Sequence, residues 1–173
     1  MSALSSLKNR LIAKVITRFP SLSKRFVDAY KPRECVGDVP FTPLRKALHN
    51  CRVALVSTCG VHHRDQKPYD MTDKEGDPTF RVIDLRKPLS DLMITHDYYD
   101  HSDADKDLNI VFPVERLREF EKEGIIGKLA DTAYGFMGHI DGHHIDTLIT
   151  KSAPEIAKKL KADNVDVVLL TPA

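Results

Sequence analysis

Two short apolar runs, one in the middle of the chain and one near its end, determine the class of fold. They span residues 52–58 and 165–170 and are rich in valine and leucine. Runs that are apolar on both alternating faces are typical of strands buried within a parallel sheet. Residues 80–84, 92–95 and 132–138 are shorter strand candidates, bounded by proline, aspartate or glycine. The sequence therefore predicts a sheet whose central strands are parallel.

Helices are predicted between these strands. An apolar face at helical spacing predicts a helix over residues 113–123, which Gly124 ends. A second helix is predicted to begin at Ser152, because Ser152 and Glu155 match a capping box and Pro154 suits a first helical turn. Strands that alternate with helices indicate an α/β fold, here a mainly parallel sheet flanked by helices.

A basic segment precedes this domain. Residues 1–33 hold eight basic residues and one acidic residue, whereas the rest of the chain holds 18 basic and 24 acidic residues. Apolar side chains recur in this segment every three or four residues, which predicts an N-terminal amphipathic helix. We expect its apolar stripe to pack on the protein's own body or on a second subunit; the alternatives are an anionic membrane or another partner. The stripe consists of Leu4, Leu7, Leu11, Ile12, Val15, Ile16 and Phe19.

Prolines at positions 32, 40 and 43 predict an extended linker after the basic segment. We therefore divide the chain into a basic helical appendage over residues 1–33, a linker over residues 34–50 and an α/β domain over residues 51–173. We expect this domain to be incomplete at its C-terminus, because its last predicted strand lies so close to the end of the sequence.

Composition and motifs exclude several classes of protein. The residues are 42% apolar and 29% charged, as in ordinary globular proteins, and no apolar run is long enough to span a bilayer. We expect no secretory signal, and three cysteines without a C-x-x-C pair favour the reducing cytoplasm. The lack of tryptophan and an aromatic content of 7% argue against a nucleic-acid partner. No dinucleotide, P-loop or serine-hydrolase motif occurs.

Three polar segments come after predicted strand ends, where α/β proteins place their sites. They span residues 60–65, 95–109 and 138–144 and contain seven of the eight histidines. The first segment is equally compatible with acid/base chemistry and with solvated loop histidines. In the second, we expect the aspartates to cap turns rather than bind metal, because neither EF-hand nor zinc-protease spacing is present. We interpret the third as a surface loop, with a metal or acid/base site as the alternative, and we predict no metal site.

Cys59 ends the first predicted strand and is the cysteine most worth weighing as a nucleophile. Basic groups near a strand end lower a thiol pKa and make the thiolate reactive. Free cysteines are more often buried as small apolar residues, and we favour that role for Cys59. Cys51 and Cys35 rank lower, since they lie at the start of the strand and in the linker.

The last predicted strand lies unusually close to the end of the sequence. A strand buried on both faces normally leads into a loop and a covering helix, and ligands bind beyond the carboxyl ends of such strands. The sequence stops at Ala173, three residues after this run. We expect either that a partner covers this edge or that the site begins beyond Ala173.

Short motifs occur in a fixed order along the domain, at residues 41–46, 52–56, 60–62, 76–81, 95–109, 111–113, 116–117 and 136–138. Together they resemble the selenoprotein B family of glycine, sarcosine, betaine and D-proline reductases. The resemblance covers roughly residues 40–173 and leaves out the basic N-terminal helix. The ordered series is far more specific than any single motif within it.

This resemblance implies reductive cleavage of the C–N bond at the α carbon of a small amino acid or betaine, a reductive deamination with a disulfide as acceptor. It implies a selenocysteine or cysteine nucleophile after a strand similar to residues 167–173, and a pyruvoyl group on a separate partner subunit. In this chain that nucleophile would come directly after Ala173. We therefore expect a selenocysteine codon to have been read as a stop, and the chain as given to be inactive alone. The other expected partners are further reductase subunits or a second copy of the chain.

No residue of the chain can be assigned as the redox centre. By analogy, the substrate-positioning or proton-handling candidates are His62, His96, Asp100, Asp103 and Asp107, and Cys59 is the weaker thiol candidate. Two alternative functions stay open at this point. One is a non-catalytic binding or assembly subunit of the same fold, and the other is a metal-dependent hydrolase built on His96, Asp100, His101 and Asp103.

Overall fold

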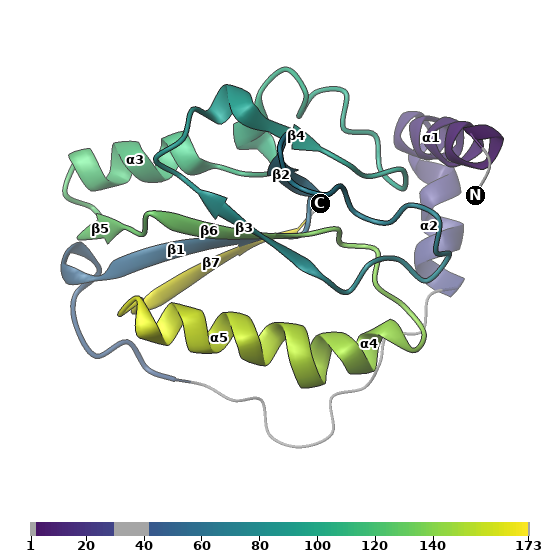
Figure 1. Cartoon of the computed structure of the whole chain (residues 1–173). Coiled ribbons are helices and arrows are strands. Elements are labelled where there is room, and N and C mark those ends of the chain that lie inside the picture. The colour runs from purple at the N-terminus through teal and green to yellow at the C-terminus, as the bar shows by residue number, and fades with distance from the viewer. Residues whose placement is uncertain (1–2, 30–41, 173) are drawn as a thin grey trace.

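A mixed five-stranded sheet forms the centre of the molecule (Figure 1). In the computed structural model, which describes residues 3–29 and 42–172, β1 is parallel to β5, β6 and β7, while β3 pairs antiparallel with β6. The α/β class with a mainly parallel sheet is therefore confirmed. The strands are β1 (Arg52–Ser57), β3 (Phe80–Asp84), β5 (Lys128–Leu129), β6 (Thr132–Phe136) and β7 (Val167–Thr171).

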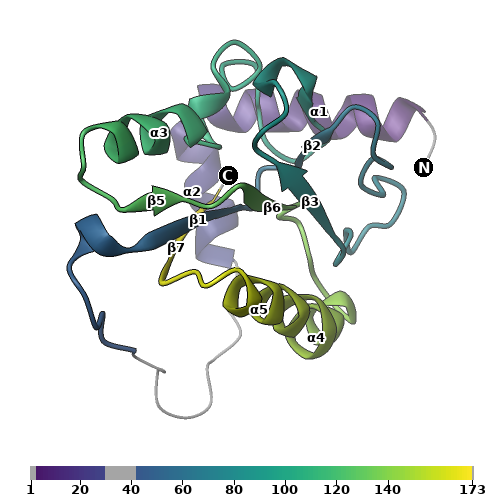
Figure 2. The same cartoon turned by 60° about the vertical axis from the view of Figure 1, so that its left-hand side comes forward.

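Helices cover both faces of this sheet (Figures 1 and 2). On one face Leu55 of β1 belongs to the larger apolar core, which also contains Leu117 of α3 (Val114–Lys122). On the other face Val56 of β1 packs in a smaller core with Ile156 of α5 (Ala153–Ala162). The side chains of successive β1 residues thus pack on opposite faces of the sheet, because side chains alternate along a strand. This explains the uninterrupted apolar run in the sequence.

A small second sheet lies beyond the carboxyl end of β1. It pairs β2 (Val61–His63) antiparallel with β4 (Leu92–Ile94). Short 3-10 turns stand at η1 (Leu48–Asn50), η2 (Leu89–Asp91) and η3 (Leu108–Ile110). The strands predicted at residues 52–58, 80–84, 92–95 and 132–138, and the helix at 113–123, are confirmed to within two residues at either end.

The predicted cap at Ser152 is wrong. The helix begins earlier, at α4 (His144–Thr147), and continues through the π-helical segment η4 (Leu148–Ser152) into α5. Ser152 has helical backbone angles, and its hydroxyl donates to the carbonyl of Pro78 at 2.7 Å instead of capping. A π segment just before Pro154 fits the physics, because proline has no N–H and its ring crowds the preceding turn.

β7 does not occupy the central, doubly buried position predicted for it. Its register with β1 is continuous from Val167 to Thr171, but its other side pairs with no strand among the described residues. Leu169 is 37% exposed and Leu170 is 70% exposed. The apolar run is therefore an edge strand in this chain, and the burial argument for a site beyond it does not hold here.

The N-terminal segment forms two helices, α1 (Ala3–Arg18) and α2 (Pro20–Ala29). Much of the predicted linker lies outside the described residues, as does Cys35. α1 contacts the domain through a narrow face on which Ala13 is buried and the Ser6 hydroxyl donates to Asp97 at 2.5 Å. No helix among the described residues is long and apolar enough to cross a membrane.

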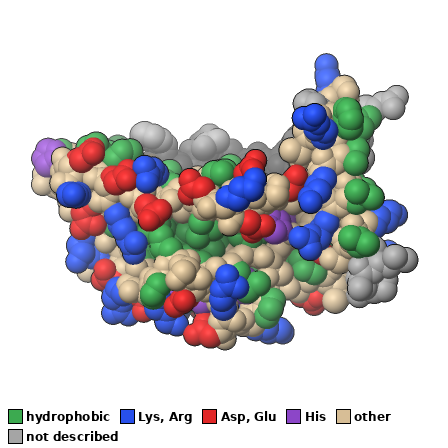
Figure 3. Space-filling model, turned by 90° about the horizontal axis from the view of Figure 1, so that it is seen from above, with side chains coloured by type: hydrophobic (Ala, Val, Ile, Leu, Met, Phe, Trp, Pro, Cys, Tyr) green, Lys and Arg blue, Asp and Glu red, His purple; other side chains and the backbone are tan. Residues whose placement is uncertain are grey.

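The apolar stripe of α1 does not pack on this protein's own body. Leu7 is 66% exposed, Leu11 62% and Phe19 55%, and Val15 is also exposed. Hydrophobic side chains accordingly gather beside Lys and Arg on the flank of the molecule where α1 lies (Figure 3). The first half of the expectation, packing on this chain's own core, is therefore wrong for these residues, because α1 docks through Ser6 and Ala13 and turns Leu7 and Leu11 outward. Packing on a second subunit stays a prediction.

Candidate functional site

The carboxyl ends of the three longer parallel strands meet at one edge of the sheet. The backbone N–H of Thr58 donates to the carbonyl of Thr171 at 3.1 Å, which joins the ends of β1 and β7. The Ser57 and Thr171 hydroxyls both donate to the carbonyl of Val111, at 2.9 and 3.0 Å. Open α/β sheets bind ligands beyond this edge, so it is the first place to look for a site.

A chain of aromatic rings, which we call the histidine–tyrosine ladder, lies beside this edge. Tyr98 stacks on His139 with ring centroids 4.1 Å apart, and His96 meets Tyr99 edge-on at 4.6 Å. Tyr99 also contacts His101, and its hydroxyl donates to the carbonyl of Cys59 at 3.0 Å. Because Cys59 lies just after β1, this bond fixes the ladder to the end of the central strand. The ladder brings together the second and third polar segments.

His96 is the buried centre of the ladder, 6% exposed. Its Nδ1 accepts the backbone N–H of Tyr98 at 3.0 Å, so the neutral ring carries its proton on Nε2. Burial lowers the pKa of His96 to about 4, and the nearby His139 and His101 rings act in the same direction. His96 is therefore neutral at physiological pH and can donate from Nε2, but it does not act as a cation there.

His62 is also fully buried, but it lies apart from the ladder's ring contacts, in β2. Its Nδ1 donates to the carbonyl of His63 at 2.8 Å, and its Nε2 accepts from the Thr95 hydroxyl at 2.8 Å. Burial lowers the pKa of His62, with smaller contributions from the Arg81 and His63 charges. Both ring nitrogens are thus engaged inside the protein, a geometry that suits a core histidine better than a proton carrier.

Two of the three predicted acidic candidates serve as local caps. Asp100 accepts from the backbone N–H of Ser102 at 3.2 Å, and Asp107 caps η3 through the backbone N–H of Asn109 at 3.0 Å. Asp103 is exposed and pairs with Lys106 at 2.8 Å. These contacts agree with the capping role expected for this segment.

The proposed hydrolase site is not assembled in the described part of the chain. His101 is paired with Asp105 at 2.8 Å, and His96 is engaged with Tyr98. Among the residues that the structure describes, the only group of three or more ligand-type side chains that converges lies elsewhere. The hydrolase hypothesis is therefore wrong in its choice of residues, since side chains close in sequence point to different partners.

Cys59 behaves as a core residue, in agreement with the role favoured for it from the sequence. It is completely buried, and that burial raises the pKa of its thiol. A buried neutral thiol is a poor nucleophile, because the thiolate is the reactive form. Cys51 is likewise completely buried.

A small cavity of about 150 Å³ lies between α1 and the second polar segment (residues 95–109), which we call the acidic segment. Arg10 and Lys14 line it from α1, and Asp100 and Asp105 line it from the acidic segment. The positive charge of Lys14 also helps to lower the pKa of Asp100. The basic segment and the acidic domain thus meet here, and the cavity carries both signs of charge.

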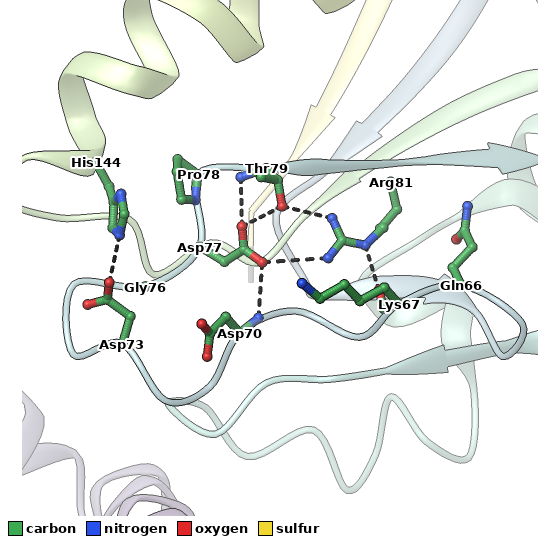
Figure 4. A pocket seen from close by; sticks show the side chains of 10 residues that line it. All are labelled: Gln66, Lys67, Asp70, Asp73, Gly76, Asp77, Pro78, Thr79, Arg81 and His144. Carbon is green, nitrogen blue, oxygen red and sulfur yellow. Dashed lines mark hydrogen bonds and ion pairs between the residues drawn. The ribbon is translucent and has the colours of Figure 1, made fainter. Parts of the chain in front are cut away.

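The motif at residues 76–81 proves to be structural (Figure 4). The Asp77 carboxylate accepts the backbone N–H groups of Asp70 and Thr79, at 3.0 and 2.8 Å, and lies 3.5 Å from Arg81. Arg81 in turn donates to the carbonyl of Lys67 at 2.7 Å. We call this set the Asp77–Arg81 network. It holds the loop before β3 and leaves neither charge free for a ligand.

Sequence reasoning missed Tyr98, Tyr99 and His139 as members of the site. Each lies in a polar segment after a strand, and that position is the signal that could have selected them. The sequence analysis named His62 and three aspartates instead, because it selected residues by their charge and acid/base chemistry and not by their position after a strand. Of the candidates named for substrate positioning or proton handling, only His96 lies in the ladder.

Comparison with known proteins gives a consistent result. The family model described as glycine/sarcosine/betaine reductase selenoprotein B matches residues 22–173, beginning within α2 and earlier than the motif series. D-proline reductase subunit gamma of Acetoanaerobium sticklandii is 40% identical over 131 residues, covering 76% of this chain and 52% of the relative. Glycine reductase complex component B subunit gamma of Carboxydothermus hydrogenoformans is 34% identical over 144 residues, covering 81% and 32%.

A further relative, betaine reductase complex component B subunit beta of Peptoclostridium acidaminophilum, is 37% identical over 133 residues, covering 73% of this chain and 29% of the relative. The chain therefore spans about half the length of the first of these relatives and about a third of the other two. No solved structure matches the chain. Because the family model matches the whole α/β domain and most of α2, the chain belongs to the glycine/sarcosine/betaine reductase selenoprotein B family.

Proposed function

We propose that this chain is the part of a selenoprotein B-type reductase that precedes and positions the redox residue. The reaction is the reductive cleavage of the C–N bond at the α carbon of a small amino acid or betaine. Family membership supports this proposal, as do the relatives, which are subunits of D-proline, glycine and betaine reductases. The substrate of this protein is one of that chemical class.

The observation that carries the proposal is the position of the carboxyl end of β7. Thr171 is hydrogen-bonded to Thr58 and to the carbonyl of Val111, at the same edge where Tyr99 bonds to Cys59. A selenocysteine or cysteine placed shortly after Thr171 would enter the molecule beside the histidine–tyrosine ladder. Such a residue, when present, would supply the nucleophile, and the two reducing electrons would come from its oxidation together with a second thiol to a selenosulfide or disulfide.

The chain's own residues then have positioning roles. His96, held neutral by burial, offers an Nε2 proton beside the reacting group, and the Tyr98 and Tyr99 rings shield it from water. The 150 Å³ cavity, with Arg10 and Lys14 opposite Asp100 and Asp105, suits a small zwitterion. A carboxylate would lie toward the basic wall and an ammonium group toward the acidic wall.

The decisive experiment is to sequence the gene and its transcript beyond the codon for Ala173. We expect an in-frame UGA codon and, after it, a coding extension that begins with a redox motif. Mass spectrometry of the protein from its native source should then find a longer chain that contains selenium. An ordinary stop codon with no coding extension would overturn the proposed position of the redox residue.

A reductase assay tests the proposed activity separately from the position of the redox residue. We expect the 173-residue chain to cleave none of glycine, sarcosine, betaine and D-proline. The extended protein, supplied with its partner subunits and a thiol reductant, should release ammonia or an amine from glycine, sarcosine or betaine, or open the ring of D-proline to a linear primary amine. Failure of the extended protein with every substrate, although it contains selenium and folds, would contradict the proposed activity.

A second candidate function is a non-catalytic assembly subunit, and the open edge of β7 favours it. Leu169 and Leu170 are exposed there, and the outer side of the strand pairs with no described strand. Unpaired strand edges readily accept another chain. Sedimentation of the purified 173-residue chain tests this reading: a stable oligomer that dissociates in Leu170→Asp supports it, and a monomer argues against it.

A further inference from the structure

Asp73 and His144 line the cavity in Figure 4, and two further ligand-type side chains, Glu75 and His143, lie beside them. Asp73 and Glu75 come from the loop before β3, and His143 and His144 come from the start of α4. His144 Nε2 lies 3.0 Å from Asp73 Oδ2, and His143 Nδ1 faces a Glu75 carboxylate oxygen. We call these four residues the Asp73–His144 cluster.

The ligand atoms of Asp73, His143 and His144 all lie within 4.8 Å of one another. Two ligands bound to one ion at about 2.1 Å are separated by at most about 4.2 Å, and by about 3.4 Å in a tetrahedral site. Small rotations of these partly exposed side chains therefore bring the three atoms around a single ion. The His143 side chain, at 69% exposure, has the freedom to make such a rotation.

The backbone beneath the cluster is fixed rather than loose. Gly76 and Ile140 form an isolated β-bridge, and the backbone N–H of Asp141 donates to the carbonyl of Glu75 at 2.8 Å. Gly142 has φ +51°, and a Cβ at that position would collide with the Glu75 carboxylate. Two segments almost seventy residues apart are thus held together so that their side chains face one another.

Hydrogen bonding alone explains only part of this arrangement. Glu75 accepts the backbone N–H of His143 at 3.3 Å, which is the ordinary role of a carboxylate at a helix start. That role requires neither imidazole. Two histidines with two carboxylates form a donor set that suits borderline ions such as Zn²⁺, and two carboxylates balance the charge of a divalent cation.

We propose that the Asp73–His144 cluster binds one divalent transition-metal ion of the Zn²⁺ type, with Asp73, His143 and His144 as ligands and Glu75 as the fourth donor. The ion links the loop before β3 to the start of α4, and so fastens the Asp77–Arg81 network to the helix that covers the sheet. The proposal is independent of the redox function, since it concerns a separate group of residues.

The test is calorimetric titration of the EDTA-treated, dialysed 173-residue chain with ZnCl₂, and separately with MgCl₂. We expect one equivalent of Zn²⁺ to bind and MgCl₂ to give no binding heat, because Mg²⁺ prefers oxygen ligands. His143→Ala and Asp73→Asn should each weaken Zn²⁺ binding by more than tenfold. Both side chains are partly exposed, and circular dichroism would verify that the variants keep the wild-type fold.

Two control variants separate this cluster from other metal donors. His49→Ala removes an exposed histidine outside the cluster, and Cys35→Ser removes the thiol that lies outside the described residues. Neither should change Zn²⁺ affinity, and Co²⁺ bound to the wild type should show d–d bands without a thiolate charge-transfer band. Unchanged affinity in His143→Ala and Asp73→Asn, loss of binding in Cys35→Ser, or no stoichiometric binding by the wild type would overturn the proposal.

Discussion

Acidification should destabilise this protein through His96. The ordinary pKa of a histidine is 6.5, and burial lowers the pKa of His96 to about 4 in the folded protein. Between these two values the unfolded chain binds a proton that the folded chain does not, so the free energy of unfolding falls as the pH falls. Each pKa unit corresponds to about 1.4 kcal/mol, so the full loss between pH 7 and pH 4 is about 3 kcal/mol. Above pH 7 this contribution is complete.

The measurement is urea unfolding monitored by circular dichroism at pH 7, 5.5 and 4. His96→Asn is the matched variant, because its side-chain oxygen can still accept the Tyr98 N–H but does not titrate. His62 shifts in the same direction in both proteins, so only the difference between the two pH slopes counts. We expect the wild type to lose about 2–3 kcal/mol more than His96→Asn on going from pH 7 to pH 4. Equal losses would refute the reasoning that His96 is buried and neutral.

The packing leads to three further expected outcomes. Gly76→Ala should lower the free energy of unfolding, measured by urea titration, by about 3 kcal/mol or more, because φ is +90° and the new Cβ would meet the carbonyl of His139. Gly124→Ala is the control: φ is +72° there but the space is open, so the change should cost only about 1 kcal/mol. Leu11→Ala should change the thermal midpoint of the isolated chain by less than about 2 °C, because Leu11 is 62% exposed; a large drop would place the stripe in a core. Ser152→Ala should cost about 1–2 kcal/mol in urea unfolding, since it leaves the Pro78 carbonyl without its buried donor; no loss would argue against that bond.

Local sequence patterns predicted where the helices and strands lie. They did not predict what each element packs against. The strand at 52–58 and the helix at 113–123 were predictable, because their apolar spacing has a single reading. The position of β7 was not, since an apolar run looks the same in the centre of a sheet and at an open edge. The contacts of the α1 stripe were unpredictable for the same reason, because periodicity shows that a helix has an apolar face but not what that face contacts.

The candidate site was harder to predict than the fold, because its members meet through long-range contacts. His96 and His139 lie in segments after different strands, and only the three-dimensional structure brings both onto Tyr98. The Asp73–His144 cluster joins residues 71 apart in the chain. Asp100 and Asp107, by contrast, were correctly expected as caps, since a cap bonds within two residues of itself.

The two described thiols determine what kind of role the chain can have in a reductive reaction. Cys51 and Cys59 are completely buried, and burial raises the pKa of Cys59 and keeps it protonated. Neither thiol can exchange with a substrate unless the core opens, at a cost comparable to local unfolding. Conversion of either cysteine to serine should therefore leave any reductase activity of the extended protein unchanged once its lower stability is allowed for. If Cys59→Ser folds and abolishes turnover in the extended protein, the redox centre lies at the end of β1, and the proposed position beyond β7 is wrong.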